Sequence, residues 1–124
     1  MSKPLAQPVA AGQRFPELRR WPRYPVSMRA EAIVLPAGGC ISGGVSILSR
    51  GGCYFRTVDT QAAGNVLRLR IESRGQTFET WARVVHAVSG DGMGMAFFDT
   101  HESHVAILTH WLAGLSSQTP VQSV

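Results

Sequence analysis

Six short runs with β-strand character, separated by turns rich in glycine and proline, constrain the fold of this chain most strongly. The clearest run is VLRLRIE, in which Leu67, Leu69 and Ile71 alternate with charged residues and therefore share one face of a strand. The predicted strands cover residues 27–35, 40–48, 53–57, 66–72, 77–88 and 93–98. Because their connections are short, the sequence predicts an antiparallel sheet.

After the last predicted strand, the spacing of the apolar residues becomes that of a helix. Asp99, with Glu102 three positions later, resembles a capping box at a helix start. The apolar stripe that follows consists of Val105, Leu108, Leu112 and Leu115. A small antiparallel sheet avoids open edges by closing into a barrel, which a terminal amphipathic helix can cover. We therefore predict an all-β fold with one helix: a six-stranded antiparallel barrel plus a C-terminal α-helix.

The chain length of 124 residues fits one domain with a single modest core. The first residues are rich in Pro, Ala and Gln and show no periodicity, so we predict a disordered tail there and a second one after the helix. The expected divisions are a tail at 1–13, an arginine-rich arm at 14–26, a barrel at 27–98, a helix at 99–115 and a tail at 116–124, so that the domain spans 14–115.

The positive charge of the chain is concentrated at its start. Residues 1–30 hold six basic side chains and one acidic side chain, whereas the remainder holds six arginines and seven acidic residues. Eleven of the twelve basic residues are arginine, which forks onto phosphate and stacks on flat rings better than lysine does. A genome rich in G and C would also favour arginine, but it would not cluster it. The bias therefore favours an anionic partner that contains aromatic rings.

No catalytic or metal-binding motif is present. The sequence lacks a Walker loop, a nucleophile elbow and a zinc pattern, so we expect neither an enzyme nor a cofactor. His101 and His104 have no third ligand at metal-site spacing, and we interpret them as surface histidines. No apolar run approaches the roughly 20 residues of a membrane span, and no signal peptide is recognisable. We therefore expect a cytoplasmic protein in which Cys40 and Cys53 are reduced thiols.

Two stretches are poorly explained by structure alone. The first, LRRWPRYPV at 18–26, places Arg19, Arg20 and Arg23 among prolines and aromatic residues. The second, ILSRGGCYF at 47–55, places Ser49 before a Gly-Gly turn. Together they resemble the PilZ domain family, which carries an RxxxR motif before its first strand and a (D/N)xSxxG motif at a strand-turn-strand.

The resemblance extends over residues 18–113 through the segments GGCYFRT, GNVLRLRI, ARVVHA and GMGMAFF. It implies a split six-stranded barrel and a function as a bacterial, cytoplasmic receptor that binds the second messenger cyclic di-GMP and relays it to a downstream protein. The ligand-binding residues that it implies are Arg19, Arg20, Arg23, Ser49, Gly51 and Gly52.

The chemistry of the arm suits this ligand, which has two phosphates and two guanines. Arg19 and Arg23 can each fork onto a phosphate or onto the O6/N7 edge of a guanine. Pro22 and Pro25 stiffen the arm and so reduce the entropy that it loses on binding.

Trp21 and Tyr24 are expected to anchor the arm on the barrel. Loops at the strand ends of a barrel gather at its mouth, so we expect Ser49 and Gly52 to lie within reach of the arm.

One position departs from the family motif. Ile47 stands where the family has Asp or Asn, and isoleucine offers no hydrogen bond to a guanine. An alternative is therefore a degenerate PilZ domain that acts as a protein-interaction adaptor without the ligand. A third possibility, ranked last because the aromatic residues are scattered along the chain, is a small basic barrel that binds single-stranded nucleic acid.

Overall fold

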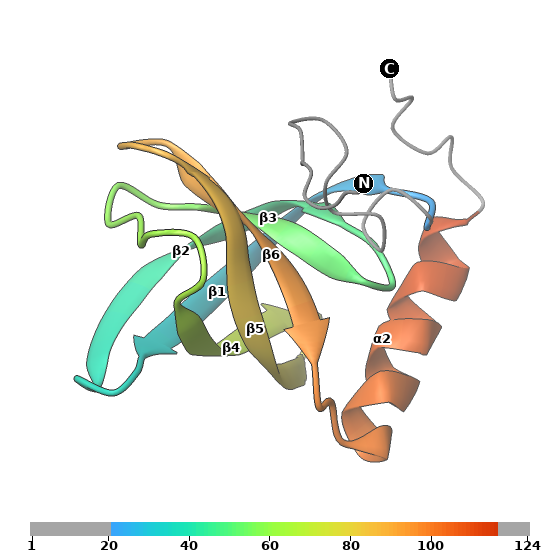
Figure 1. Cartoon of the computed structure of the whole chain (residues 1–124). Helices are drawn as coiled ribbons and strands as arrows, with labels where there is room; N and C mark the ends of the chain where they lie inside the picture. Colours follow the sequence, from blue (N-terminus) through green and yellow to red (C-terminus); the bar gives the residue numbers. More distant parts are fainter. Residues whose placement is uncertain (1–20, 117–124) are drawn as a thin grey trace, which may run out of the picture.

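The computed structural model describes residues 21–116; the predicted N-terminal tail, arm residues 14–20 and residues 117–124 lie outside them. The elements are β1 (Tyr24–Val34), β2 (Gly39–Leu48), β3 (Gly52–Arg56), β4 (Val66–Ser73), β5 (Gln76–Val88), β6 (Gly92–Phe98) and α2 (Glu102–Leu115). The strands form a closed barrel in the order β1-β2-β3-β6-β5-β4, in which every neighbouring pair is antiparallel (Figure 1). This confirms the predicted fold class.

The barrel interior is filled by the alternating apolar residues of the strands. Leu67, Leu69 and Ile71 of β4 are fully buried, as their spacing predicts. Met93 and Met95 of β6 are also fully buried and belong to the core. The arginines between the core residues of β4 point outward, so the sheet separates an apolar inside from a charged outside.

β1 begins earlier than the sequence predicts, at Tyr24 instead of residue 27. Tyr24 is buried in the barrel, and Pro25 lies opposite Ile47 of β2. A proline usually interrupts a strand because it cannot donate a hydrogen bond. Here β4 pairs with β1 only from Arg29 onward, so the start of β1 is bonded on one side and accommodates Pro25. The end of the predicted arm is therefore part of the barrel.

Bulges bend three of the strands. The registers shift between Pro25 and Met28 of β1, between Val45 and Ile47 of β2, and between Val84 and His86 of β5. A bulge increases the local twist and bends its strand, which helps a sheet of this size to close.

α2 packs against β5 on one side of the barrel (Figure 1). Its residues Leu108 and Trp111 are buried, and the Trp111 Nε1–H donates to Gln76 Oε1 at 3.0 Å. His104 Nδ1 accepts a hydrogen bond from the backbone N–H of Glu79 at 3.0 Å. β6 pairs with β5 only from Trp81 onward, so His104 provides an acceptor beyond the end of β6.

The predicted helix cap is wrong. Asp99 has a φ of +48°, and the helix begins only at Glu102, after His101 as the N-cap residue. His101 Nδ1 accepts a hydrogen bond from the backbone N–H of Ser103 at 3.1 Å. Asp tolerates the left-handed conformation better than most residues, so Asp99 turns the chain out of β6 instead of capping α2.

Gly43 of β2 allows the neighbouring strand β3 to approach closely. A Cβ at Gly43 would collide with the backbone carbonyl of Arg56 on β3. We expect Gly43→Ala to lower the free energy of unfolding by about 1–3 kcal/mol, because backbone atoms must shift. Gly39→Ala is the matched control, since Gly39 is exposed at the start of β2 with open space around its Cα. Thermal unfolding followed by circular dichroism measures both, and equal melting temperatures would contradict this packing.

Candidate functional site

The turn between β2 and β3 is held by its own serine. Ser49 is almost completely buried, and its hydroxyl accepts hydrogen bonds from the backbone N–H groups of Gly51 and Gly52 at 3.3 and 3.2 Å. The same hydroxyl donates to the carbonyl of Gly52 at 3.2 Å, and the Ser49 N–H donates to that carbonyl at 2.9 Å. Ser49 thus stabilises the turn through hydrogen bonds within it. A direct contact between Ser49 and a ligand stays a prediction.

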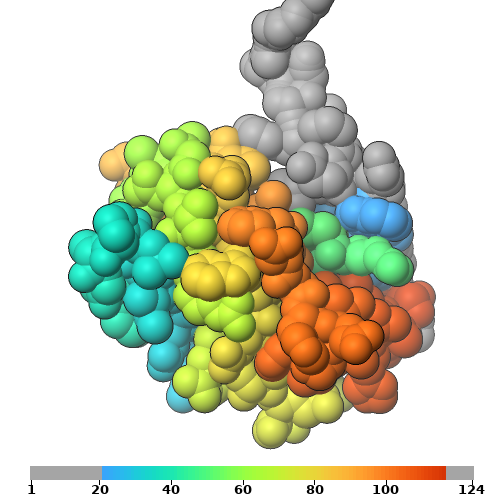
Figure 2. Space-filling view, turned by 60° about the horizontal axis from the view of Figure 1, so that its bottom comes forward, coloured from blue at the N-terminus to red at the C-terminus, as the bar shows by residue number. Residues whose placement is uncertain are grey.

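The arm and this turn meet at the barrel surface. The guanidinium of Arg50 lies 5.2 Å from the centre of the Trp21 ring, within range of a cation–π interaction. Figure 2 shows the blue start of β1 beside the green residues that follow the β2–β3 turn. Arg19 and Arg20 lie outside the described residues, so their distance from the turn stays a prediction.

Arg23 is the one predicted arm ligand within the described residues, and its charge acts on His86 of β5. Burial, and secondly the positive charge of Arg23, lower the pKa of His86 below its ordinary value. The imidazole is therefore neutral at neutral pH. The positive charge of Arg23 therefore acts on the part of β5 that carries His86.

Ile47 belongs to the same outer face. In the strand registers, Pro25 lies opposite Ile47, Ile47 opposite Tyr54, Tyr54 opposite Gly94, and Gly94 opposite His86. Residues directly opposite one another in a sheet point to the same side. Ile47 is half-buried on the outside of the barrel, so the residue that replaces the acidic motif position faces the arm side and not the core.

An acidic side chain, that of Asp91, contacts two residues of this face. Asp91 lies in the turn before β6, and the Tyr54 hydroxyl donates to Asp91 Oδ2 at 2.6 Å. Arg56 Nη2 lies 3.2 Å from Asp91 Oδ1. Burial, followed by the bond and charge of Asp91, raises the pKa of Tyr54 to about 12, so the phenol stays neutral and donates. Sequence reasoning missed Tyr54 because the contact joins residues that are distant in the chain.

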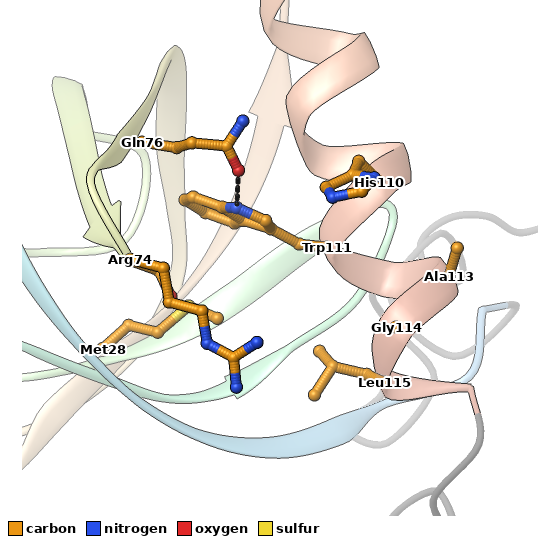
Figure 3. A pocket seen from close by; sticks show the side chains of 9 residues that line it. Met28, Arg74, Gln76, His110, Trp111, Ala113, Gly114 and Leu115 are labelled. Carbon is orange, nitrogen blue, oxygen red and sulfur yellow. Dashed lines mark hydrogen bonds between the residues drawn. The ribbon is translucent and has the colours of Figure 1, made fainter.

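A groove beside α2 is the other concave feature of note. A cavity of about 430 Å³ lies between the helix and the β4–β5 turn, lined by Met28, Arg74, Trp111 and Leu115 among others (Figure 3). Its polar features include the Trp111–Gln76 hydrogen bond. Of the predicted ligand-binding residues that the structure describes, none lines this groove.

The histidines near the helix start have structural roles. His101 caps α2, and His104 fastens it to β5. Among residues 21–116, no group of three or more His, Cys, Asp and Glu side chains is arranged to hold a metal ion.

Within the same range, no helix is both long and apolar enough to cross a membrane. Cys53 is buried, and burial raises the pKa of its thiol, which keeps it protonated.

The family comparison agrees with the motifs. The model of the PilZ domain family matches residues 17–114 of this chain. Comparison with the curated proteins gave no match.

Solved structures share the fold. The Bacillus subtilis inhibitor of motility (MotI/DgrA) superimposes with a TM-score of 0.66 at 18% identity, covering 80% of this chain but 51% of that one. The PilZ domain of CeSA from a cellulose-synthesizing bacterium gives a TM-score of 0.61 at 19% identity and covers 76% and 97% of the two chains. The PilZ domain with c-di-GMP of YcgR from Escherichia coli gives 0.63 at 12% identity and covers 80% and 92%. This chain therefore spans about half of MotI/DgrA and nearly all of the two isolated domains.

We expect Ser49→Ala to lower the free energy of unfolding by about 1–3 kcal/mol, because it leaves buried N–H groups of the turn without their acceptor. Ser42→Ala is the control, since Ser42 is exposed on β2, the strand that leads into the turn. Chemical denaturation of both variants measures the difference. A loss no larger than that of the control would contradict the turn-shaping role of Ser49.

Proposed function

Because the chain belongs to the PilZ domain family, we propose that it is a receptor that binds cyclic di-GMP and relays the signal to a partner protein. The PilZ domain of YcgR, which has the same fold, was solved with this ligand. The observation that carries the proposal is the contact between Trp21 and Arg50. It joins the middle residue of the RxxxR segment to a residue of the SxxG turn, although the two are far apart in sequence.

In this proposal the arm supplies the charge. Arg19, Arg20 and Arg23 form charge-assisted hydrogen bonds to the phosphates and to the guanine edges of the ligand. Guanidinium groups are suited to both contacts, because they present paired donors and a flat face.

In this proposal the β2–β3 turn provides a preformed backbone surface for the ligand. Ser49 holds Gly51 and Gly52 in place through its hydroxyl, and these residues have no side chain that would obstruct a ligand. Because the turn is bonded internally, it is already formed before a ligand arrives, which reduces the entropy lost on binding. The proposed ligand-binding set is therefore Arg19, Arg20, Arg23, Ser49, Gly51 and Gly52.

We further propose that the protein acts by binding and not by catalysis, in the cytoplasm, on a downstream protein. Ile47 favours one alternative, an adaptor that has lost the ligand and only binds a partner. The two readings differ in a single measurable quantity, the heat released when cyclic di-GMP is added.

Titration calorimetry with cyclic di-GMP is the direct test. We expect the wild-type protein to bind in the micromolar range, about −8 kcal/mol. Arg23→Ala should abolish measurable binding, because it removes a charge-assisted contact at the centre of the site. Arg29→Ala, which removes an exposed arginine of β1 outside the motif, should bind like the wild type. An absence of heat from folded wild-type protein would favour the adaptor instead.

The second test concerns the departure from the motif. We expect Ile47→Asp to tighten binding by roughly ten- to hundred-fold, because an acceptor for guanine N–H donors returns to the site. Ile33→Asp is the control for added charge, since Ile33 is exposed on β1. The fold should persist by circular dichroism, because Ile47 is only half-buried on the outer face. Unfolding of Ile47→Asp, or unchanged affinity, would argue against a ligand beside this position.

A further inference from the structure

The groove beside α2 takes no part in the proposed binding of cyclic di-GMP. It lies between the helix and the turn that joins β4 to β5, and its volume is about 430 Å³ (Figure 3). A cavity of this size is within the range of sites that bury a ligand or the anchoring side chains of a partner. We call it the α2 groove, and its walls include Met28, Arg74, Gln76, Trp111 and Leu115.

The floor of the α2 groove is apolar and already formed. Met28 and Leu115 pack against the core from outside and are only half-buried, so part of their apolar surface faces the groove. The Trp111 indole is fixed by its hydrogen bond to Gln76 Oε1 at 3.0 Å, which reduces the entropy lost when a partner binds. Met, Trp and Arg are also the residue types enriched in protein interfaces. The floor therefore suits apolar side chains of another protein.

The rim of the α2 groove is positively charged. Among residues 21–116, no acidic side chain lines the groove, and none forms an ion pair with Arg74. The adjoining hollow adds Arg29 and Glu72, and Glu72 already lies 3.8 Å from Arg70. A partner with carboxylates next to its apolar side chains would complement this charge.

The end of α2 offers little competing charge. The carbonyls of Leu112 and Ala113 accept hydrogen bonds from the backbone N–H and the hydroxyl of Ser116 at 2.9 and 2.7 Å. A helix end carries at most about half an elementary charge, on carbonyls that lack such donors. The full charge of Arg74 therefore outweighs it at the rim.

The turn itself does not explain why Arg74 is an arginine. Arg74 and Gly75 are the two residues between β4 and β5, and their φ angles are +51° and +79°. Such a turn favours Asn, Asp or Gly, because other side chains are strained at positive φ. Figure 3 shows the Arg74 side chain reaching from the turn toward Leu115 of α2. This placement points to a role for the guanidinium at the groove.

We propose that the α2 groove docks an amphipathic helical segment of the downstream protein, with acidic side chains beside its apolar anchors. This inference deepens the proposed function and rests on its relay to a partner protein. The apolar anchors of the segment lie on Met28, Trp111 and Leu115, and a carboxylate pairs with Arg74. The described residues proposed to bind cyclic di-GMP do not line the groove, so ligand and partner do not compete for them.

Two synthetic peptides of about 15 residues test this with the full chain and without cyclic di-GMP. Both carry leucines at helical spacing, and their other positions are alanine and glutamate in one peptide but alanine and lysine in the other. The NMR signal of the Trp111 Nε1–H, assigned by its loss in Trp111→Phe, reports on the groove. We expect the acidic peptide to shift this signal to saturation, and the basic peptide to bind roughly threefold to tenfold more weakly.

Variants of the rim and the floor sharpen the test. Arg74→Glu should reverse the preference between the peptides, because attraction becomes repulsion, whereas Arg74→Lys should keep it. Leu115→Ser should weaken both peptides roughly tenfold, because an apolar contact is lost. Arg83→Glu is the matched control for net charge and should keep the preference, since Arg83 is exposed on β5 outside the groove. Circular dichroism verifies that each variant is folded.

The results distinguish this inference from the proposed function. If neither peptide shifts the Trp111 signal, or if Arg74→Glu leaves the preference unchanged, the docking surface is wrong, whereas binding of cyclic di-GMP would still support the receptor. If the acidic peptide binds as expected but cyclic di-GMP releases no heat, the docking surface stands and the ligand does not.

Two further results would identify another occupant of the groove and overturn the inference. A Trp111 signal that shifts with protein concentration alone indicates a second copy of the chain. Peptide binding that appears only in the double variant Phe15→Ser and Leu18→Ser indicates that the N-terminal segment of the chain itself occupies the groove.

Discussion

The pairing of β1 with β4 is the interaction on which the rest of the structure depends. Residues 29–34 of β1 lie opposite residues 67–72 of β4, and this ladder turns an open sheet into a barrel. The same strand begins at Tyr24, directly after the motif arginine Arg23. Closure of the barrel therefore also fixes where the arm leaves the surface. Fold and site are coupled because one strand serves both.

A second constraint is the use of glycine where strands or side chains approach each other closely. Gly43 lets β3 approach β2 closely, while Gly92 and Gly94 make room for rings on the outside of β6. These residues weaken local strand propensity, which favours side chains that pack on a pleated surface. The barrel tolerates them because the cooperative ladders on both sides hold the strands in register.

Much of the fold was predictable because alternation along a strand reflects burial directly. The spacing of Leu67, Leu69 and Ile71 predicts that they share one face of a strand, and in the structure that face is fully buried. The start of β1 was not predictable, since whether Pro25 can lie in a strand depends on the neighbour that β1 lacks there. The helix cap was wrong because Asp99 and His101 both suit a helix start, and only the direction of the chain leaving β6 decides between them.

The candidate site was predictable only where its residues are neighbours in sequence. The SxxG turn has a local hydrogen-bond pattern that short motifs capture well. In contrast, the contacts of Tyr54 with Asp91 and of His104 with Glu79 join different elements. Such pairs depend on strand order and register, and the alternating glycines of GMG in β6 were the only local sign that rings cover that strand.

The bulge in β5 divides this strand into two mechanically different halves. The first half holds α2 through Gln76 and Glu79, whereas His86 stands just beyond the bulge, near the other end. A regular ladder is stiff, but an unpaired extra residue gives its strand a place to bend. The bulge lets the two halves of β5 run in different directions, so the orientation of the end that carries His86 is set separately from the register that anchors the helix. One strand thus joins two regions of the barrel whose geometries are fixed by different partners.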